Sequence, residues 1–159
     1  DFPIEGIMFR DITTLLANPD AFRTTIDGLL APYKDEQIDK VVVIESRGFI
    51  FGTPMAYELS AGVVPVRKPG KLPAETLTEE YELEYGTNTL QIHTDAVNPG
   101  ERVIIVDDLL ATGGTVEASI RLVEKLGGVI VGVSVLAELL ELNGRDRIQG
   151  YPVHSLVRY

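Results

Sequence analysis

Two adjacent aspartates, Asp107 and Asp108, stand just before a turn of small residues rich in glycine and threonine, Ala111-Thr112-Gly113-Gly114-Thr115. Helical periodicity begins directly after this turn. Backbone N–H groups at a helix start carry partial positive charge, and glycine lets them approach an anion closely. Ionised Asp accepts hydrogen bonds from a diol and ligates hard cations such as Mg²⁺. A ribose 5-phosphate would satisfy both halves of the pattern.

Other phosphate motifs do not fit this stretch. No Gly-Lys-Ser/Thr follows the turn, as a Walker loop requires, and the Gly-x-Gly-x-x-Gly dinucleotide fingerprint is missing. The alternative is a solvated pair of aspartates that caps an ordinary helix.

A second group of residues could hold an anion. The sequence Glu45-Ser46-Arg47-Gly48 follows an apolar run, and Arg67, Lys68 and Lys71 form a basic cluster in a chain whose net charge is −10. Arg matches phosphate oxygens with its planar fork, and Lys supplies a point charge. The cluster therefore favours an anion site over the alternative, a solvated basic loop.

The elements around these residues alternate between strand and helix. Apolar runs predict strands at 40–44, 63–66, 103–106, 129–136 and 153–157, and apolar spacing predicts helices at 19–33, 51–61 and 116–126. We expect Asn18 to cap the first helix and Gly62 to end the second. This order predicts an α/β fold, a mostly parallel twisted sheet flanked by helices. Ligands bind at the carboxyl ends of such strands, so both groups of residues should face one crevice.

Two further segments have recognisable patterns. Residues 81–85 and 89–93 alternate polar and apolar side chains across Gly86-Thr87-Asn88, which predicts a half-exposed β-hairpin. Residues 1–12 combine Pro, Gly and bulky apolar side chains without a helical period, which predicts an ordered covering loop.

Composition narrows the class of protein. The length of 159 residues suits one domain, and the acidic balance argues against nucleic acid or an anionic membrane as a partner. The chain has no Cys, so it has no disulfide or thiol nucleophile, and the isolated His93 and His154 receive no role. No apolar run of transmembrane length or signal peptide is visible, so we expect a soluble, cytoplasmic protein.

The stretch from Val106 to Thr115 resembles the phosphoribosyl-pyrophosphate (PRPP) signature of the type I phosphoribosyltransferases, in the version found in members that use adenine. The resemblance extends from Phe2 to Tyr159. It implies a single domain over 1–159 of type I phosphoribosyltransferase-like fold, with residues 1–12 as a base-binding hood and 67–92 as a lid and hairpin. It further implies transfer of phosphoribose from Mg²⁺-PRPP to adenine, and a homodimer.

The resemblance also implies roles for individual residues. Asp107 and Asp108 would hold the ribose, and Ala111, Thr112, Gly113, Gly114 and Thr115 the 5′-phosphate. The predicted pyrophosphate contacts are Glu45, Ser46, Arg47, Arg67, Lys68 and Lys71. The predicted adenine contacts are Met8, Phe9, Arg10 and Leu109, and the predicted catalytic residues are Glu84 and Tyr85. Mg²⁺ would bind mainly through the substrate, with Asp107 as a candidate ligand.

Alternatives remain for the individual residues and for the activity. Phe9 could belong to the core, and Glu82 and Glu84 could be the solvated face of a hairpin. Guanine, xanthine or orotate could replace adenine, and a non-catalytic PRPP-binding regulator would share the signature. Because water would hydrolyse PRPP, we expect residues 72–85 to close over the site as a lid.

Overall fold

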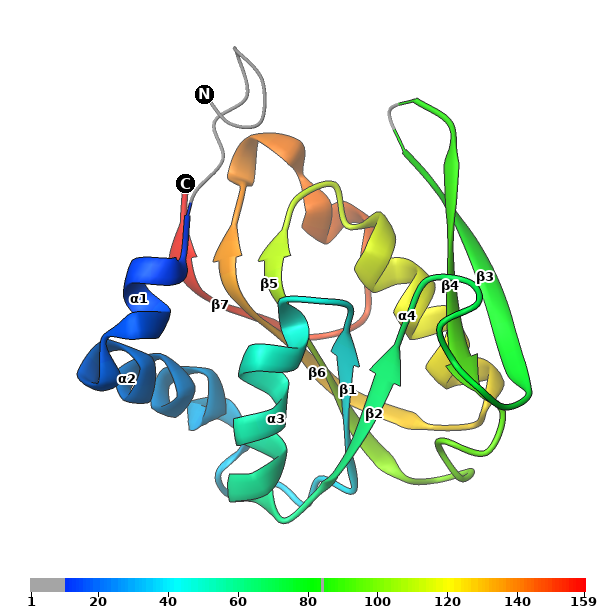
Figure 1. Cartoon of the computed structure of the whole chain (residues 1–159), viewed down its shortest axis with the longest axis horizontal. Helices are drawn as coiled ribbons and strands as arrows, with labels where there is room; N and C mark the ends of the chain where they lie inside the picture. The colour runs from blue at the N-terminus through cyan, green and yellow to red at the C-terminus, as the bar shows by residue number, and fades with distance from the viewer. Residues whose placement is uncertain (1–10, 84) are drawn as a thin grey trace.

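The computed structural model of the chain describes residues 11–83 and 85–159. Its main sheet has five parallel strands in the order β2-β1-β5-β6-β7. Their bounds are β1 Lys40–Ile44, β2 Gly62–Val66, β5 Arg102–Leu110, β6 Val129–Glu138 and β7 Val153–Arg158. The carboxyl ends of β5, β6 and β7 lie at one edge of the sheet, at the top of Figure 1. The predicted parallel α/β sheet is confirmed.

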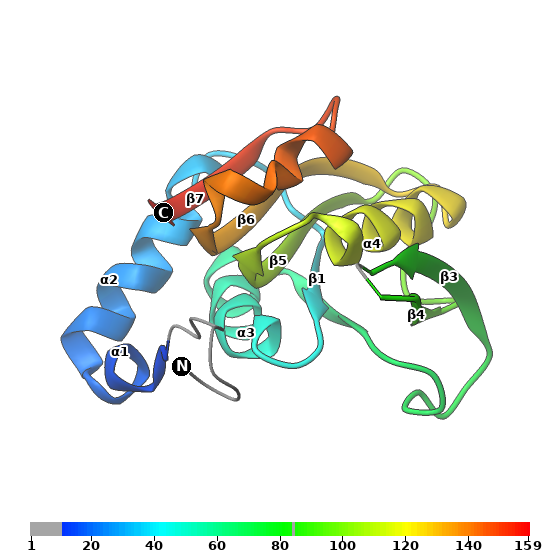
Figure 2. The same ribbon diagram turned by 90° about the horizontal axis from the view of Figure 1, so that it is seen from above.

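Helices cover both faces of this sheet. The helices α2 (Pro19–Leu30) and α3 (Gly48–Leu59) pack on one face, and α4 (Gly114–Lys125) packs on the other (Figure 2). The short α1 (Thr13–Ala17) precedes α2, and 3-10 turns follow as η1 Ala31–Tyr33, η2 Leu140–Leu142 and η3 Gly144–Arg147. No helix in the described part of the chain is both long and apolar enough to cross a membrane.

The alternation of side chains in the central strands divides the core into two layers. Val41 and Val43 of β1 pack in the cluster that includes α2 and α3, whereas Val42 and Ile44 pack in the cluster that includes α4. Side chains in β5 alternate between the same two clusters. Because both faces are apolar, the strands appear in the sequence as unbroken apolar runs.

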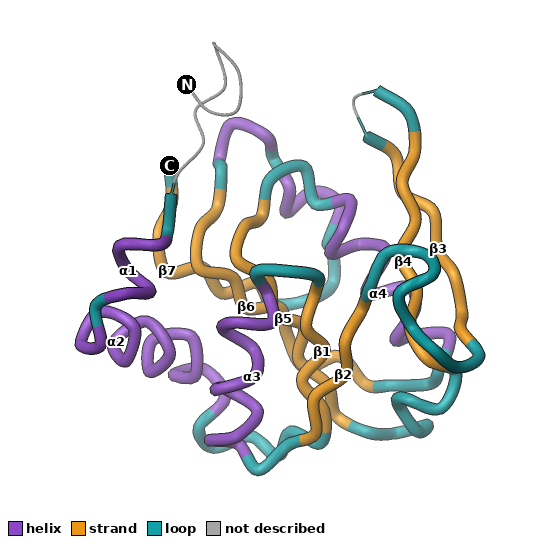
Figure 3. The backbone as a smooth tube through the Cα atoms, in the orientation of Figure 1, coloured by secondary structure: helices purple, strands orange, loops and turns teal. Residues whose placement is uncertain are grey.

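The strands β3 (Thr76–Glu82) and β4 (Thr87–His93) form a separate antiparallel hairpin. This hairpin lies beside α4 (Figure 3). Tyr81, on β3, is buried in the α4 cluster. Glu79 forms ion pairs with Arg121 and Lys125 of α4. The base of the hairpin is therefore fixed to the helix by both apolar and charged contacts.

The predicted bounds of this hairpin were partly wrong. Its first strand begins at Thr76, five residues before the predicted start at Tyr81, and pairs Glu82 with Thr87. The turn closes when the Leu83 N–H donates to the Gly86 carbonyl at 2.8 Å, and Gly86 has a positive φ of 93°. The left-handed backbone of Gly86 thus places the reversal before Thr87.

Three other predicted boundaries can be compared with the structure. Asn18 caps α2 as predicted, accepting from the Ala21 N–H at 2.9 Å. The predicted end of α3 at Gly62 was wrong, because Ser60 takes the left-handed position, and Gly62 already begins β2, where its N–H donates to the Asp39 carbonyl just before β1. The predicted end of the central strand at Val106 was also wrong, because β5 stays paired with β6 as far as Leu110.

Candidate active site

A cavity of about 490 Å³ opens at the carboxyl ends of β1 and β5. Its lining brings together most of the residues predicted for ribose, phosphate and pyrophosphate, and one residue predicted for adenine, Leu109. These are Glu45, Ser46, Arg47, Lys68, Asp107, Asp108, Leu109, Ala111, Thr112, Gly113 and Thr115. Residues more than 60 positions apart in the sequence meet here because β1 and β5 are neighbours in the sheet. The predicted single crevice is confirmed.

The glycine turn leads directly from β5 into α4. Gly113 occupies the N-cap position with φ 88°, a left-handed conformation that residues with a Cβ rarely adopt. The helix begins at Gly114, so the backbone N–H groups of its first turn have no partner within the helix. With Thr112 and Thr115 lining the same cavity, the turn has the geometry and the donors to bind a phosphate.

The two aspartates on β5 have different environments. Asp107 is buried and accepts a hydrogen bond from the Asp108 N–H at 2.8 Å. Burial and the neighbouring charge of Asp108 raise the pKa of Asp107 well above its usual value. Asp108 forms an ion pair with Arg47, whose Nε lies 2.6 Å from its Oδ2. The pair therefore combines a buried carboxyl whose pKa is raised with a carboxylate already paired with a cation.

The loop after β1 leads into α3 and is held in place by a carboxylate. Glu45 accepts from the Lys68 N–H at 2.7 Å and pairs with Arg67 at 3.1 Å. Burial raises the pKa of Glu45, but these hydrogen bonds and the charge of Arg67 outweigh it, so the net shift is downward. Glu45 therefore links the loop after β1 to the basic segment after β2.

The sequence model of the phosphoribosyl transferase domain matches residues 11–156. The chain belongs to the phosphoribosyltransferase family. An adenine phosphoribosyltransferase of Brachyspira hyodysenteriae is 58% identical over 159 residues, covering 100% of this chain and 94% of the relative. The structure of an adenine phosphoribosyltransferase from Rhodothermus marinus matches with a TM-score of 0.96 and 54% identity, covering 100% of this chain and 91% of that one.

A further solved structure of this phosphoribosyltransferase family carries ligands. It is the adenine phosphoribosyltransferase of Saccharomyces cerevisiae in complex with an imino-altritol bisphosphate and adenine. It matches with a TM-score of 0.90 and 42% identity, covering 97% of this chain and 89% of that chain. The type I phosphoribosyltransferase fold predicted from the sequence is thus confirmed.

Other predicted site residues of this phosphoribosyltransferase lie away from the cavity lining. Gly114 faces Tyr81 and Arg147, and Lys71 is exposed. Arg67 lies over the Phe49 ring at 5.8 Å, and its buried Nε has no hydrogen-bond partner in the described structure. The side chain of Tyr85 is 89% exposed. Met8, Phe9, Arg10 and Glu84 lie outside the described residues.

Four lining residues were not predicted from the sequence, namely Tyr81, Leu90, Leu110 and Val116. Tyr81 and Leu90 come from the two strands of the hairpin, and both are buried. The alternating pattern did predict one buried face of this hairpin, but it carried no sign that this face closes a wall of the cavity. That contact depends on how the hairpin docks on α4.

The donor set of the cavity suits a hard divalent cation only in part. Carboxylate oxygens of Asp107 and Asp108 line it, and such oxygens are the ligands that Mg²⁺ prefers. Within residues 11–83 and 85–159, no group of three or more His, Cys, Asp or Glu side chains could hold a metal ion. A cation here would therefore have to take most of its ligands from a bound substrate or from water.

Proposed function

We propose that this phosphoribosyltransferase transfers the 5-phosphoribosyl group of PRPP to adenine, giving AMP and pyrophosphate for purine salvage. The observation that carries the proposal is one cavity lined by the Asp pair, the glycine turn and Arg47. The choice of adenine is supported by relatives of more than 50% identity over the whole chain, which are named adenine phosphoribosyltransferase.

The reaction exchanges two bonds at the anomeric carbon of the ribose. The bond from C1′ to the pyrophosphate oxygen breaks, and a bond from C1′ to N9 of adenine forms. Positive charge develops on the sugar in between, so nearby carboxylates and a neutralised leaving group lower the barrier. Asp107 and Asp108 provide the negative charge in this proposal, and they hold the 2′ and 3′ hydroxyls.

The 5′-phosphate and the pyrophosphate of PRPP are held by different parts of the chain. Residues 111–115 bind the 5′-phosphate through backbone N–H groups and threonine hydroxyls. Glu45, Ser46, Arg47, Arg67, Lys68 and Lys71 form the pyrophosphate site. Within it, Glu45 acts indirectly, because a carboxylate repels pyrophosphate but holds Arg67 and the Lys68 backbone in position.

Adenine binds beside the ribose site in this proposal. Leu109 lines the cavity and would contact one face of the purine, with Phe9 on the other face. Backbone groups of Met8 and Arg10 would read its hydrogen-bonding edge. Glu84 would accept or relay the proton that adenine loses as N9 attacks, and Tyr85 would help to close the site. The fixed base of the hairpin confines closure to its tip and to the segment before Thr76.

Mg²⁺ bound to PRPP would neutralise charge on the departing pyrophosphate, with Asp107 as a candidate ligand from the protein. The proposal also includes a single catalytic domain over residues 1–159, a homodimer and a cytoplasmic location. Sedimentation of the purified protein would test the dimer.

An assay for AMP formed from adenine and PRPP, with and without Mg²⁺, tests the proposal directly. We expect turnover that requires PRPP and increases with Mg²⁺. Parallel reactions with guanine, xanthine and orotate test the choice of base. Faster turnover of another base would replace adenine in the proposal, and binding of PRPP without turnover of any base would identify a regulator instead.

A further inference from the structure

The loop that follows β6 packs directly against the glycine turn. We refer to residues 139–147 as the backing segment. A Cβ added to Gly144 would lie 2.4 Å from the Ala111 carbonyl oxygen, and one added to Gly113 would lie 2.5 Å from the Gly144 carbonyl oxygen. Real Cβ atoms do not approach backbone oxygens so closely. The two backbones therefore meet at a distance that only glycine permits.

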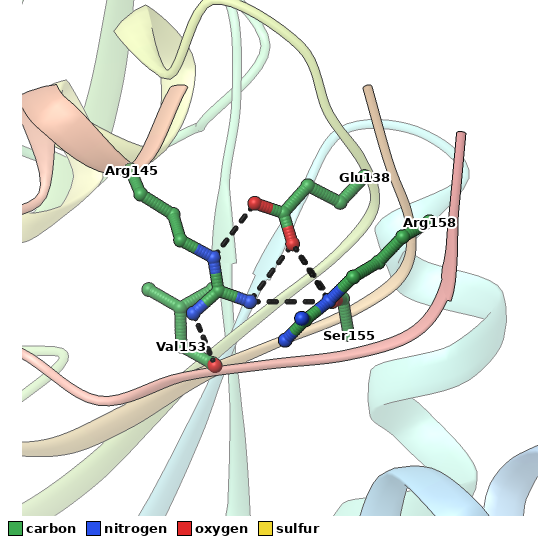
Figure 4. Close-up of polar contacts among 5 residues, drawn as sticks. All are labelled: Glu138, Arg145, Val153, Ser155 and Arg158. Atoms are coloured by element: carbon green, nitrogen blue, oxygen red, sulfur yellow. Dashed lines mark hydrogen bonds and ion pairs between the residues drawn. The ribbon is translucent and has the colours of Figure 1, made fainter. Parts of the chain in front are cut away.

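The backing segment is anchored by a polar network around the buried carboxylate of Glu138 (Figure 4). Arg145 donates to both carboxylate oxygens of Glu138, from Nε at 2.7 Å and Nη2 at 2.8 Å. It also donates to the Val153 carbonyl at 2.9 Å, and Ser155 donates to Glu138 at 2.8 Å. Glu138 is only 3% exposed, and its pKa is lowered first by the hydrogen bond from Arg145. A forked pair of this kind, made to a buried carboxylate, fixes orientation as well as position.

A second arginine of the backing segment reaches the start of α4. The Nε of Arg147 lies 3.1 Å from Oε2 of Glu117, a residue in the first turn of that helix. Its Nη1 would lie 3.2 Å from a Cβ placed on Gly114. The backing segment thus lies against the turn at Ala111, Gly113 and Gly114.

We propose that Arg145 and Gly144 are positioning residues for the phosphate group of the substrate. The Glu138–Arg145 fork holds Gly144 against the turn, and Gly144 sets the positions of the N–H groups that bind phosphate. Small errors in such positions weaken binding and catalysis strongly. This inference rests on the proposed function, because it assumes that residues 111–115 hold the 5′-phosphate of PRPP.

Three variants test the role of the backing segment. Arg145→Gln removes the fork, Arg145→Lys keeps the charge but loses the fork, and Gly144→Ala pushes directly on Ala111. The probe is ribose 5-phosphate, measured by calorimetry, together with KM for PRPP and for adenine. We expect Arg145→Gln and Gly144→Ala to weaken ribose 5-phosphate binding and raise KM for PRPP about tenfold, with KM for adenine changed less than about twofold. Arg145→Lys should lie between the wild type and Arg145→Gln.

Arg102→Gln is the matched control. Arg102 is the first residue of β5, at the end of the strand opposite to the cavity, where it contacts Glu36 and the Gln37 carbonyl. Its side chain is 38% exposed, compared with 37% for Arg145. The Arg102→Gln substitution should lower thermal stability without changing the affinity for ribose 5-phosphate.

The outcomes separate this inference from the proposed function. If the Arg145 and Gly144 variants lose thermal stability but keep wild-type ribose 5-phosphate affinity, the backing segment serves stability alone and the inference is wrong. If the wild type forms no AMP and binds no ribose 5-phosphate, the proposed function is wrong instead. Gly144→Ala leaves the Glu138 network intact, so it remains informative if Arg145→Gln does not fold.

Discussion

The Nε of Arg47 lies 2.6 Å from Oδ2 of Asp108, and both residues line the cavity. Arg47 follows β1 and Asp108 belongs to β5, so the ion pair joins the proposed pyrophosphate site to the proposed ribose site. PRPP carries its ribose hydroxyls and its pyrophosphate on adjacent carbons, and it would therefore contact both residues at once. Binding then exchanges an ion pair within the protein for contacts with the substrate, and the cation stays close to both anions.

Arg47→Lys should weaken PRPP binding selectively. Lysine keeps the positive charge but cannot make the two parallel hydrogen bonds of a guanidinium. A lost hydrogen bond to a charged group costs about 1.5 to 3 kcal/mol, so KM for PRPP should rise about tenfold or more. Ribose 5-phosphate has no pyrophosphate, and its affinity, measured by calorimetry, is the internal control. An equal loss for both ligands would place Arg47 outside the pyrophosphate site.

Asp107→Asn should make the protein more stable at neutral pH and less active. Burial of Asp107 and the charge of Asp108 raise its pKa in the folded state above the ordinary value of 3.8. As pH rises above that value, the unfolded chain releases this proton first, so ionisation of Asp107 progressively destabilises the fold. Asparagine removes the penalty and keeps an oxygen that can accept from the Asp108 N–H.

Urea unfolding across a pH series measures this effect. The stability gained by Asp107→Asn should be near zero below the unfolded pKa, grow as pH rises through the folded pKa, and then level off. Asp35→Asn, in an exposed turn, is the control and should show no such trend. If Asp107→Asn is less stable than the wild type at every pH, the ionised carboxylate of Asp107 does not destabilise the fold and the prediction is wrong. The KM for PRPP should rise in Asp107→Asn and stay at the wild-type value in Asp35→Asn.

Gly48→Ala should disturb the contact between the start of α3 and β5, the strand that carries Asp107 and Asp108. An added Cβ would lie 2.8 Å from the Val106 carbonyl oxygen and 3.2 Å from Oδ1 of Asp107. Because backbone atoms cannot move aside, we expect a loss of about 1 to 3 kcal/mol in the free energy of unfolding, together with a higher KM for PRPP. Gly62→Ala is the matched control, since its Cβ would meet only the flexible Lys40 side chain. Comparable effects in the two variants would contradict the prediction.

The sequence predicted the sheet and the cavity well because their signals are local. Four successive apolar residues before Asp107 specify a buried strand, and the rule that sites lie at the carboxyl ends of parallel strands brings Arg47 to the same crevice. The length of β5 was not predictable in this way. Asp108 and Leu110 are paired with or lie beside β6, and only the extent of that neighbour decides where the strand ends.

The roles of the backing segment and of the hairpin residues that line the cavity were not predicted, for a related reason. Gly144 has no helical or strand period around it, and its importance comes from Ala111 and Gly113, about 30 positions earlier. Tyr81 alternates like any residue of an amphipathic strand, although its ring lines the cavity. Contacts between distant segments set both roles, and no local pattern encodes them.

Glu84→Gln should separate the chemical step from substrate binding. If the carboxylate handles the proton that adenine loses, its amide cannot, and kcat should fall about a hundredfold or more. The affinity for ribose 5-phosphate should stay near the wild-type value, because residues 111–115 are unchanged. Single-turnover formation of AMP at saturating PRPP measures the chemical step directly.

Glu82→Gln is the matched control for Glu84→Gln. Glu82 is the last residue of β3 and is exposed, and it lines the groove between β3 and α4, not the cavity. The two substitutions remove the same charge two residues apart, so a general effect of charge on the hairpin would lower kcat equally in both. We expect a large loss only at Glu84. Equal rates in the two variants would remove Glu84 from the mechanism and leave proton transfer to water or to another group.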